Sequence, residues 1–78
     1  MSSERLYVLA GNHAQSEYWR KHAGISLREW IYISDARRLA GAQRPRYTRI
    51  GTWWTRKDLD RIEIQLKVCD AQEVGRDG

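Results

Sequence analysis

A short apolar run that stops at a glycine stands near the start of the sequence. Residues 6–10 are apolar and end at Gly11, and this length with this stop predicts a buried strand. Asn12 then stands where a helix N-cap would, with Gln15 at the spacing of a capping box. Apolar and aromatic residues follow at helical intervals as far as Gly24, a glycine placed as a C-terminal stop. We expect strand, tight turn and helix in this order.

The middle of the chain predicts two further strands. Residues 30–34 are aromatic and β-branched, which is typical of a strand. Asp35 can cap a brief helix over residues 36–40, which Gly41 would close. Residues 46–52 then follow the lone proline and are expected to form the third strand.

The last apolar segment fits two patterns. Leu59, Ile62, Leu66 and Cys69 recur at helical spacing, whereas residues 62–68 alternate as a strand would. We favour the helix, because capping residues precede it and because a sheet with one long helix needs further cover.

These elements predict one α/β domain over residues 1–78, with residues 2–5 and 72–78 frayed. The expected architecture is a minimal three-stranded, mostly parallel sheet, half-Rossmann-like, with two main helices and a short connecting helix. Such a sheet leaves two unpaired edges, so a homodimer is a further expectation.

Ligands of parallel α/β sheets bind where the strands end. Here that edge would hold Asn12 and His13 after the first strand, Asp35 after the second and Thr52 after the third. A degenerate nucleotide-binding half-domain is therefore one hypothesis. A capped turn explains the first of these loops better, because it has one glycine, Gly11, and no lysine follows it.

Catalytic and metal-binding patterns are missing from the sequence. Cys69 is the one cysteine and has no evident base beside it, and the two histidines have no metal-ligand partners at a suitable spacing. We expect no catalytic residue, no metal, no cofactor and no enzyme activity. A single cysteine, no leader and no long apolar run lead us to expect a cytosolic protein without a membrane segment.

Positive charge is concentrated in residues 36–57, although the net charge is only +4. This block has seven basic residues and no acidic one, and its basic residues are mostly arginine, which suits bidentate contacts with carboxylates or phosphates. Aromatic residues interleave with the arginines, so nucleic-acid binding through residues 36–57 is an alternative function.

Two adjacent tryptophans are the feature most typical of a binding surface. In an extended segment, Trp53 and Trp54 would point to opposite sides, so we expect one ring to pack inside and the other to lie on the surface near arginine. The residues predicted to bind a partner are Trp53, Trp54, Arg37, Arg38, Arg46, Arg49 and Arg56.

Four segments resemble a set of small actinobacteriophage proteins, of the mycobacteriophage type: 8–12 together with Gln15, 28–35, 39–41 and 50–53. Those proteins are short Rossmann-like chains of unknown function, similar to a truncated nucleotide-binding or helicase-type half-domain. The likeness extends from Leu6 to about Leu66. It implies a phage-encoded accessory protein in the cytoplasm of the bacterial host, and it carries over no catalytic residue. We therefore expect a non-enzymatic interaction module that binds a host protein, itself, or both.

Overall fold

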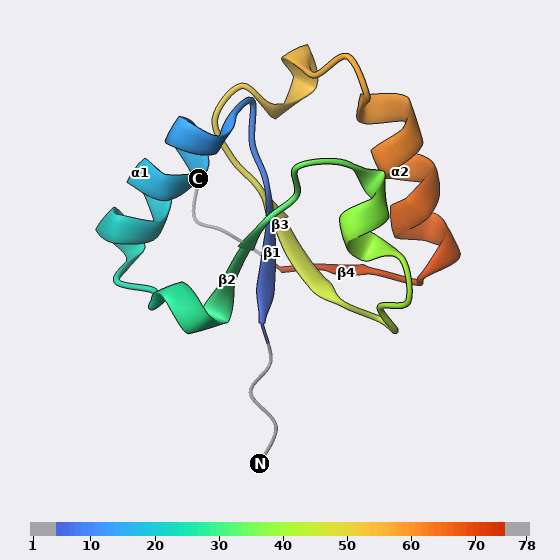
Figure 1. The fold of residues 1–78 in the computed structure, drawn as a ribbon, viewed down its shortest axis with the longest axis horizontal. Coiled ribbons are helices and arrows are strands. Elements are labelled where there is room, and N and C mark those ends of the chain that lie inside the picture. The colour runs from blue at the N-terminus through green and yellow to red at the C-terminus, as the bar shows by residue number, and fades with distance from the viewer. Residues whose placement is uncertain (1–4, 75–78) are drawn as a thin grey trace.

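A parallel sheet forms the centre of the molecule (Figure 1). The computed structural model describes residues 5–74. Within that range the strands are β1 (Leu6–Leu9), β2 (Trp30–Tyr32), β3 (Arg46–Arg49) and β4 (Gln72–Glu73). Their order across the sheet is β2-β1-β3-β4, and each neighbouring pair is parallel. The predicted α/β class and the parallel sheet are confirmed.

Helices lie on both sides of this sheet (Figure 1). Helix α1 (His13–Ala23) lies on one side and α2 (Leu59–Val68) on the other. Three short 3-10 helices complete the connections: η1 (Leu27–Glu29), η2 (Ala36–Leu39) and η3 (Trp53–Thr55). The two main helices were predicted, and η2 is the short connecting helix expected after Asp35. No helix in residues 5–74 is both long enough and apolar enough to cross a bilayer.

The prediction of three strands is wrong, because a fourth strand pairs with β3. Gln72 and Glu73 were expected to be frayed, but they lie beside Arg46 and Tyr47 in parallel register. The Gln72 N–H donates to the Pro45 carbonyl over 2.8 Å. Both β4 residues are polar and exposed, so backbone hydrogen bonds rather than apolar burial hold the strand. Val74 was also expected to fray, but its N–H donates to the Tyr47 carbonyl over 2.8 Å. Arg5 directly precedes β1, and residues 2–4 and 75–78, the rest of the segments expected to fray, lie outside the described range.

The helix favoured for the last apolar segment is confirmed as α2. Its buried residues, Ile62 and Leu66, face the core, whereas Ile64 and Val68, which produced the strand-like alternation, are exposed. The third strand is shorter than predicted, since it ends at Arg49 instead of residue 52. Residues 50–52 lead into a turn, in which Gly51 has left-handed backbone with φ 60°.

The caps of α1 were predicted correctly. The Asn12 side chain accepts a hydrogen bond from the Gln15 N–H over 2.9 Å. Gly24 ends the helix in the left-handed region with φ 73°, and its N–H donates to carbonyls of the last turn. The turn between β1 and α1 is therefore fixed by local hydrogen bonds.

The main core lies on the α2 side of the sheet. Side chains of β1, β3 and the end of β2 meet those of η2 and α2 there, and the buried members are Leu9, Ile33, Leu39, Tyr47, Ile62, Leu66 and Cys69. The α1 side is thinner, since among the α1 residues, all of them described, only Ser16 is buried. The Trp30 indole donates to the Ser16 hydroxyl over 2.7 Å, which ties α1 to β2.

Candidate functional site

The two adjacent tryptophans lie in η3, at one end of the molecule beyond the end of β3 (Figure 1). The extended segment expected there is a 3-10 turn instead. Trp53 packs against the core, whereas Trp54 is 59% exposed. As expected, one ring is inside and one outside. The rings are perpendicular, with centroids 5.8 Å apart, so the exposed indole stands on the packed one.

Arg49 holds the packed tryptophan in place. Its guanidinium lies 4.8 Å from the centre of the Trp53 ring and hydrogen-bonds Tyr47 and Glu63 at 3.1 and 3.2 Å. Burial lowers the pKa of Arg49, but the Tyr47 hydrogen bond and the charges of Glu63 and Glu73 outweigh it, so the net shift is upward. Arg49 is thus a permanent cation with a side chain 20% exposed, and Tyr47, Glu63 and Trp53 engage its guanidinium within the fold.

Arg56 is also used internally. Its guanidinium donates to the backbone carbonyls of Ala10, Ile33 and Ser34, where β1 and β2 end. Two further hydrogen bonds of 3.1 Å reach the Asp58 carboxylate, and the Arg56 side chain is only 6% exposed. Arg56 therefore closes the carboxyl end of the sheet, and a partner cannot reach it on the surface.

The remaining predicted arginines are exposed but dispersed. Arg37 is on η2, with a side chain 91% exposed that lies 3.5 Å from Asp35. Arg37 and Arg61 line a hollow of about 510 Å³ between η2 and the start of α2. Arg38 lines a different hollow, beside β2. Arg46 begins β3 and so lies at the end of the sheet opposite η3. The structure does not gather the basic block into one patch.

The predicted ligand edge is filled by protein groups. Asn12 and Asp35 accept hydrogen bonds from the backbone of the helices that they cap. His13 packs edge-on against the rings of Trp30 and Tyr32, with centroids 5.5 and 5.2 Å away. These three side chains are occupied in local packing and capping.

Thr52, the fourth residue of this edge, is bound by Gln15. The Gln15 side-chain oxygen accepts hydrogen bonds from the backbone N–H groups of Gly11 and Thr52, each over 3.0 Å. The chain leaves β1 toward one side of the sheet and β3 toward the other. In a doubly wound fold, the ligand binds between two neighbouring strands whose connections diverge in this way. Here the Gln15 amide occupies the position. In the sequence, Gln15 indicated only a capping position.

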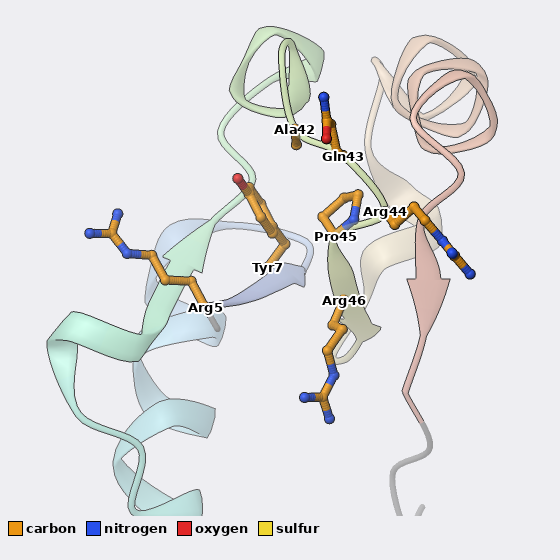
Figure 2. Close-up of a pocket in the computed structure, with 7 residues that line it drawn as sticks. All are labelled: Arg5, Tyr7, Ala42, Gln43, Arg44, Pro45 and Arg46. Carbon is orange, nitrogen blue, oxygen red and sulfur yellow. The ribbon is translucent and has the colours of Figure 1, made fainter. Parts of the chain in front are cut away.

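A third hollow lies near the amino ends of β1 and β3 (Figure 2). Its volume is about 300 Å³, and Tyr7 and Pro45 stand in its middle. The side chains of Arg5, Arg44 and Arg46 line it but point in different directions (Figure 2). These cations do not converge on a single ligand position. Arg5 and Tyr7 lie outside the basic block and were not predicted as site residues.

Cys69 belongs to the hydrophobic core. Cys69 is buried, and burial raises the pKa of its thiol. A thiol with a raised pKa is a weaker nucleophile at neutral pH than an ordinary cysteine. Residues 5–74 contain no group of three or more His, Cys, Asp or Glu side chains placed to hold a metal ion.

Comparison with known proteins yields no match. No family model fits the chain, and neither a curated protein nor a solved structure matches it.

Proposed function

We propose that the protein is a non-enzymatic protein–protein interaction module that uses Trp54 as its anchor. The observation that carries this proposal is the exposed Trp54 indole on a rigid base. Exposed tryptophan is enriched among the residues that dominate binding energy at interfaces. Its base is Trp53, and the Arg49 guanidinium lies over the Trp53 ring.

Rigidity of the anchor favours binding, since a fixed side chain loses little conformational entropy on association. The η3 turn is held by a hydrogen bond of 2.7 Å from the Thr55 hydroxyl to the Thr52 carbonyl. Gln15 in turn holds Thr52 against the start of α1. The Trp54 backbone is therefore fixed before any partner arrives.

The surroundings of the anchor favour a partner with an acidic rim. Lys57 follows η3, three residues after Trp54, and is exposed. Charges at the rim of an interface increase the association rate and select partners of opposite charge. The resemblance to small actinobacteriophage proteins supports a bacterial host protein as this partner, met in the host cytoplasm.

The test is capture of a partner from an actinobacterial host lysate with the tagged protein. We expect a specific protein to be retained, to be lost with Trp54→Ala, and to remain with Tyr18→Ala. Tyr18 is the matched control, because it is an aromatic residue 66% exposed on α1. Circular dichroism must show that both variants stay folded. Failure to retain any specific protein, or equal loss with both variants, would contradict the proposal.

Nucleic-acid binding through residues 36–57 has less support. Arg49 and Arg56 are engaged internally, and the Trp53 ring is covered by Arg49. A mobility-shift assay with single- and double-stranded DNA at low salt tests it, since phosphate contacts depend strongly on salt. A shift that weakens steeply with added salt would favour this alternative over the protein partner.

A further inference from the structure

Strand β2 lies at the edge of the described sheet, with β1 on one side only. A hollow of about 340 Å³ lies along β2, and the strand residues that line it are Trp30, Ile31 and Tyr32. Neighbouring residues of a strand point to opposite faces of the sheet. Because all three line one hollow, that hollow runs along the edge of the strand rather than over one face.

An open strand edge presents backbone groups that can pair with another extended chain. On its other side β2 pairs with β1 in parallel register. Trp30, Ile31 and Tyr32 lie opposite Leu6, Tyr7 and Val8. The edge that faces the hollow therefore has the geometry to accept one more strand.

Positive charge borders this edge. Arg5 and Arg38 line the hollow together with the three β2 residues, and no acidic residue of the described range lines it. In Figure 2 the Arg5 side chain points away from Pro45 and Arg46. Within residues 5–74, neither Arg5 nor Arg38 forms an ion pair. Both cations are thus available to an anionic partner.

The same charge argues against a second copy of this chain at the edge. Pairing two β2 edges would bring Arg5 and Arg38 of one protomer toward the same cations of its partner, and like charges in opposed positions disfavour association. The complementary occupant is an extended segment with carboxylate side chains, because arginine binds carboxylates through paired hydrogen bonds.

We propose that an extended acidic segment of a partner protein adds to the sheet beside β2, with its carboxylates on Arg5 and Arg38. Main-chain hydrogen bonds would supply affinity, and the two arginines would select acidic sequences. This surface lies apart from Trp54, and its occupation does not depend on the anchor proposed above.

The first experiment uses three fluorescent peptide probes and fluorescence anisotropy. One alternates valine and glutamate, the second alternates valine and lysine, and the third is the glutamate peptide with alternate backbone amides methylated. We expect the first to bind and the other two to bind at least about tenfold more weakly, since they lose either the charge match or the main-chain pairing. Equal binding of the first and third probes would overturn strand addition.

Charge-reversal variants test the role of the arginines. Arg38→Glu should weaken binding of the glutamate peptide by about tenfold or more and favour the lysine peptide. Lys67→Glu is the matched control on α2, with the same change in net charge, and should leave the affinity within about twofold. Equal effects of the two variants would overturn the proposal, because they would indicate a response to net charge alone.

Hydrogen exchange supplies a readout independent of affinity. Bound glutamate peptide should slow exchange of the Trp30 and Tyr32 amides, which lie on the free side of β2 because the Ile33 N–H already donates to Val8 of β1. The effect should be equal in the wild-type protein and in Trp54→Ala. Retained protection in that variant separates this site from the Trp54 surface. If the free protein sediments as a dimer with these amides already protected, a second copy occupies the edge and the proposal fails.

Discussion

The side-chain amide of Gln15 is hydrogen-bonded to both the backbone and the side chain of Thr52. Its oxygen accepts from the Thr52 N–H over 3.0 Å, and its nitrogen donates to the Thr52 hydroxyl over 2.9 Å. The same oxygen accepts from the Gly11 N–H. One side chain thus joins the loop after β1 to the loop after β3, beneath the turn that presents Trp54.

Removing this amide should destabilise the protein. Gln15→Ala leaves the part-buried N–H groups of Gly11 and Thr52 without their acceptor, and we expect a loss of about 1–3 kcal/mol in the free energy of unfolding. Urea denaturation measures it. Gln15→Glu keeps an acceptor oxygen and should cost less. Equal losses for the two variants would show that the acceptor oxygen retained by glutamate contributes nothing to stability.

The glycine at position 51 is required by the same amide. A Cβ at Gly51 would collide with the Gln15 side-chain oxygen, and the residue has φ 60°. Gly51→Ala should therefore cost more than Gly41→Ala, where φ is 84° but no atom lies within 4 Å of the added carbon. The Gly41 variant bears only the backbone strain of about 1–2 kcal/mol.

A double-mutant cycle isolates the collision. In a Gln15→Ala background, Gly51→Ala should cost no more than the backbone strain, because the colliding oxygen is absent. Additive losses from the two substitutions would place the effect elsewhere.

Replacement of Arg56 should be among the most destabilising changes. Arg56→Ala leaves three strand-end carbonyls and the Asp58 carboxylate without their donor, and we expect a loss of about 2–4 kcal/mol. Arg56→Lys should recover only part of it, since an ammonium cannot reproduce the fork of donors. Arg37→Ala is the exposed control, with an expected change of less than about 0.5 kcal/mol.

Alanine substitution of the two tryptophans should affect the stability of the protein to different extents. Trp54→Ala should change thermal stability little, because its ring is mostly exposed. Trp53→Ala should cost about 2–4 kcal/mol, since it removes the ring packed on the core and under Arg49. Thermal unfolding followed by tryptophan fluorescence, with Tyr18→Ala as reference, measures both. A large loss for Trp54→Ala would mean that this indole is structural.

Cys69 should make stability fall at alkaline pH. Burial raises the pKa of the thiol in the folded state, so as pH rises above the ordinary thiol pKa the unfolded chain loses this proton first. The contribution is complete below the unfolded pKa and is lost as pH approaches the folded one. Denaturation from neutral to alkaline pH should show a smaller decline for Cys69→Ala than for the wild type. Parallel declines would assign the effect to other groups.

Local patterns in the sequence predicted the local structure well. The capping of α1 by Asn12 and its end at Gly24 depend on residues within one turn, and both are confirmed. Helix α2 was favoured over a strand because capping residues precede it and because the sheet needed further cover. In the structure Asp58 stands at its N-cap but makes no side-chain capping hydrogen bond, and Ile62, Leu66 and Cys69 lie in the core. Strand β4 was missed, since two polar residues joined to β3 by backbone hydrogen bonds give no apolar pattern.

Long-range partners explain why the site was predicted only in part. Arg49 and Arg56 look like surface cations in the sequence, and only the fold brings Glu63 or the ends of β1 and β2 to them. Gln15 gave a capping signal, but its bond to Thr52 spans 37 positions and has no local trace. One packed and one exposed tryptophan were anticipated from an extended segment, and that segment is a 3-10 turn. Which of the two rings is exposed was not predicted.

The central place of β1 has a consequence for how the chain is made. Both neighbours of β1, β2 and β3, follow it in sequence, and β4 follows them all. During translation β1 emerges first and has no partner until the later strands have left the ribosome. Of the described strands, the apolar Leu6–Leu9 segment is therefore the one that waits longest for its partners, and the described sheet is complete only once synthesis has passed Glu73.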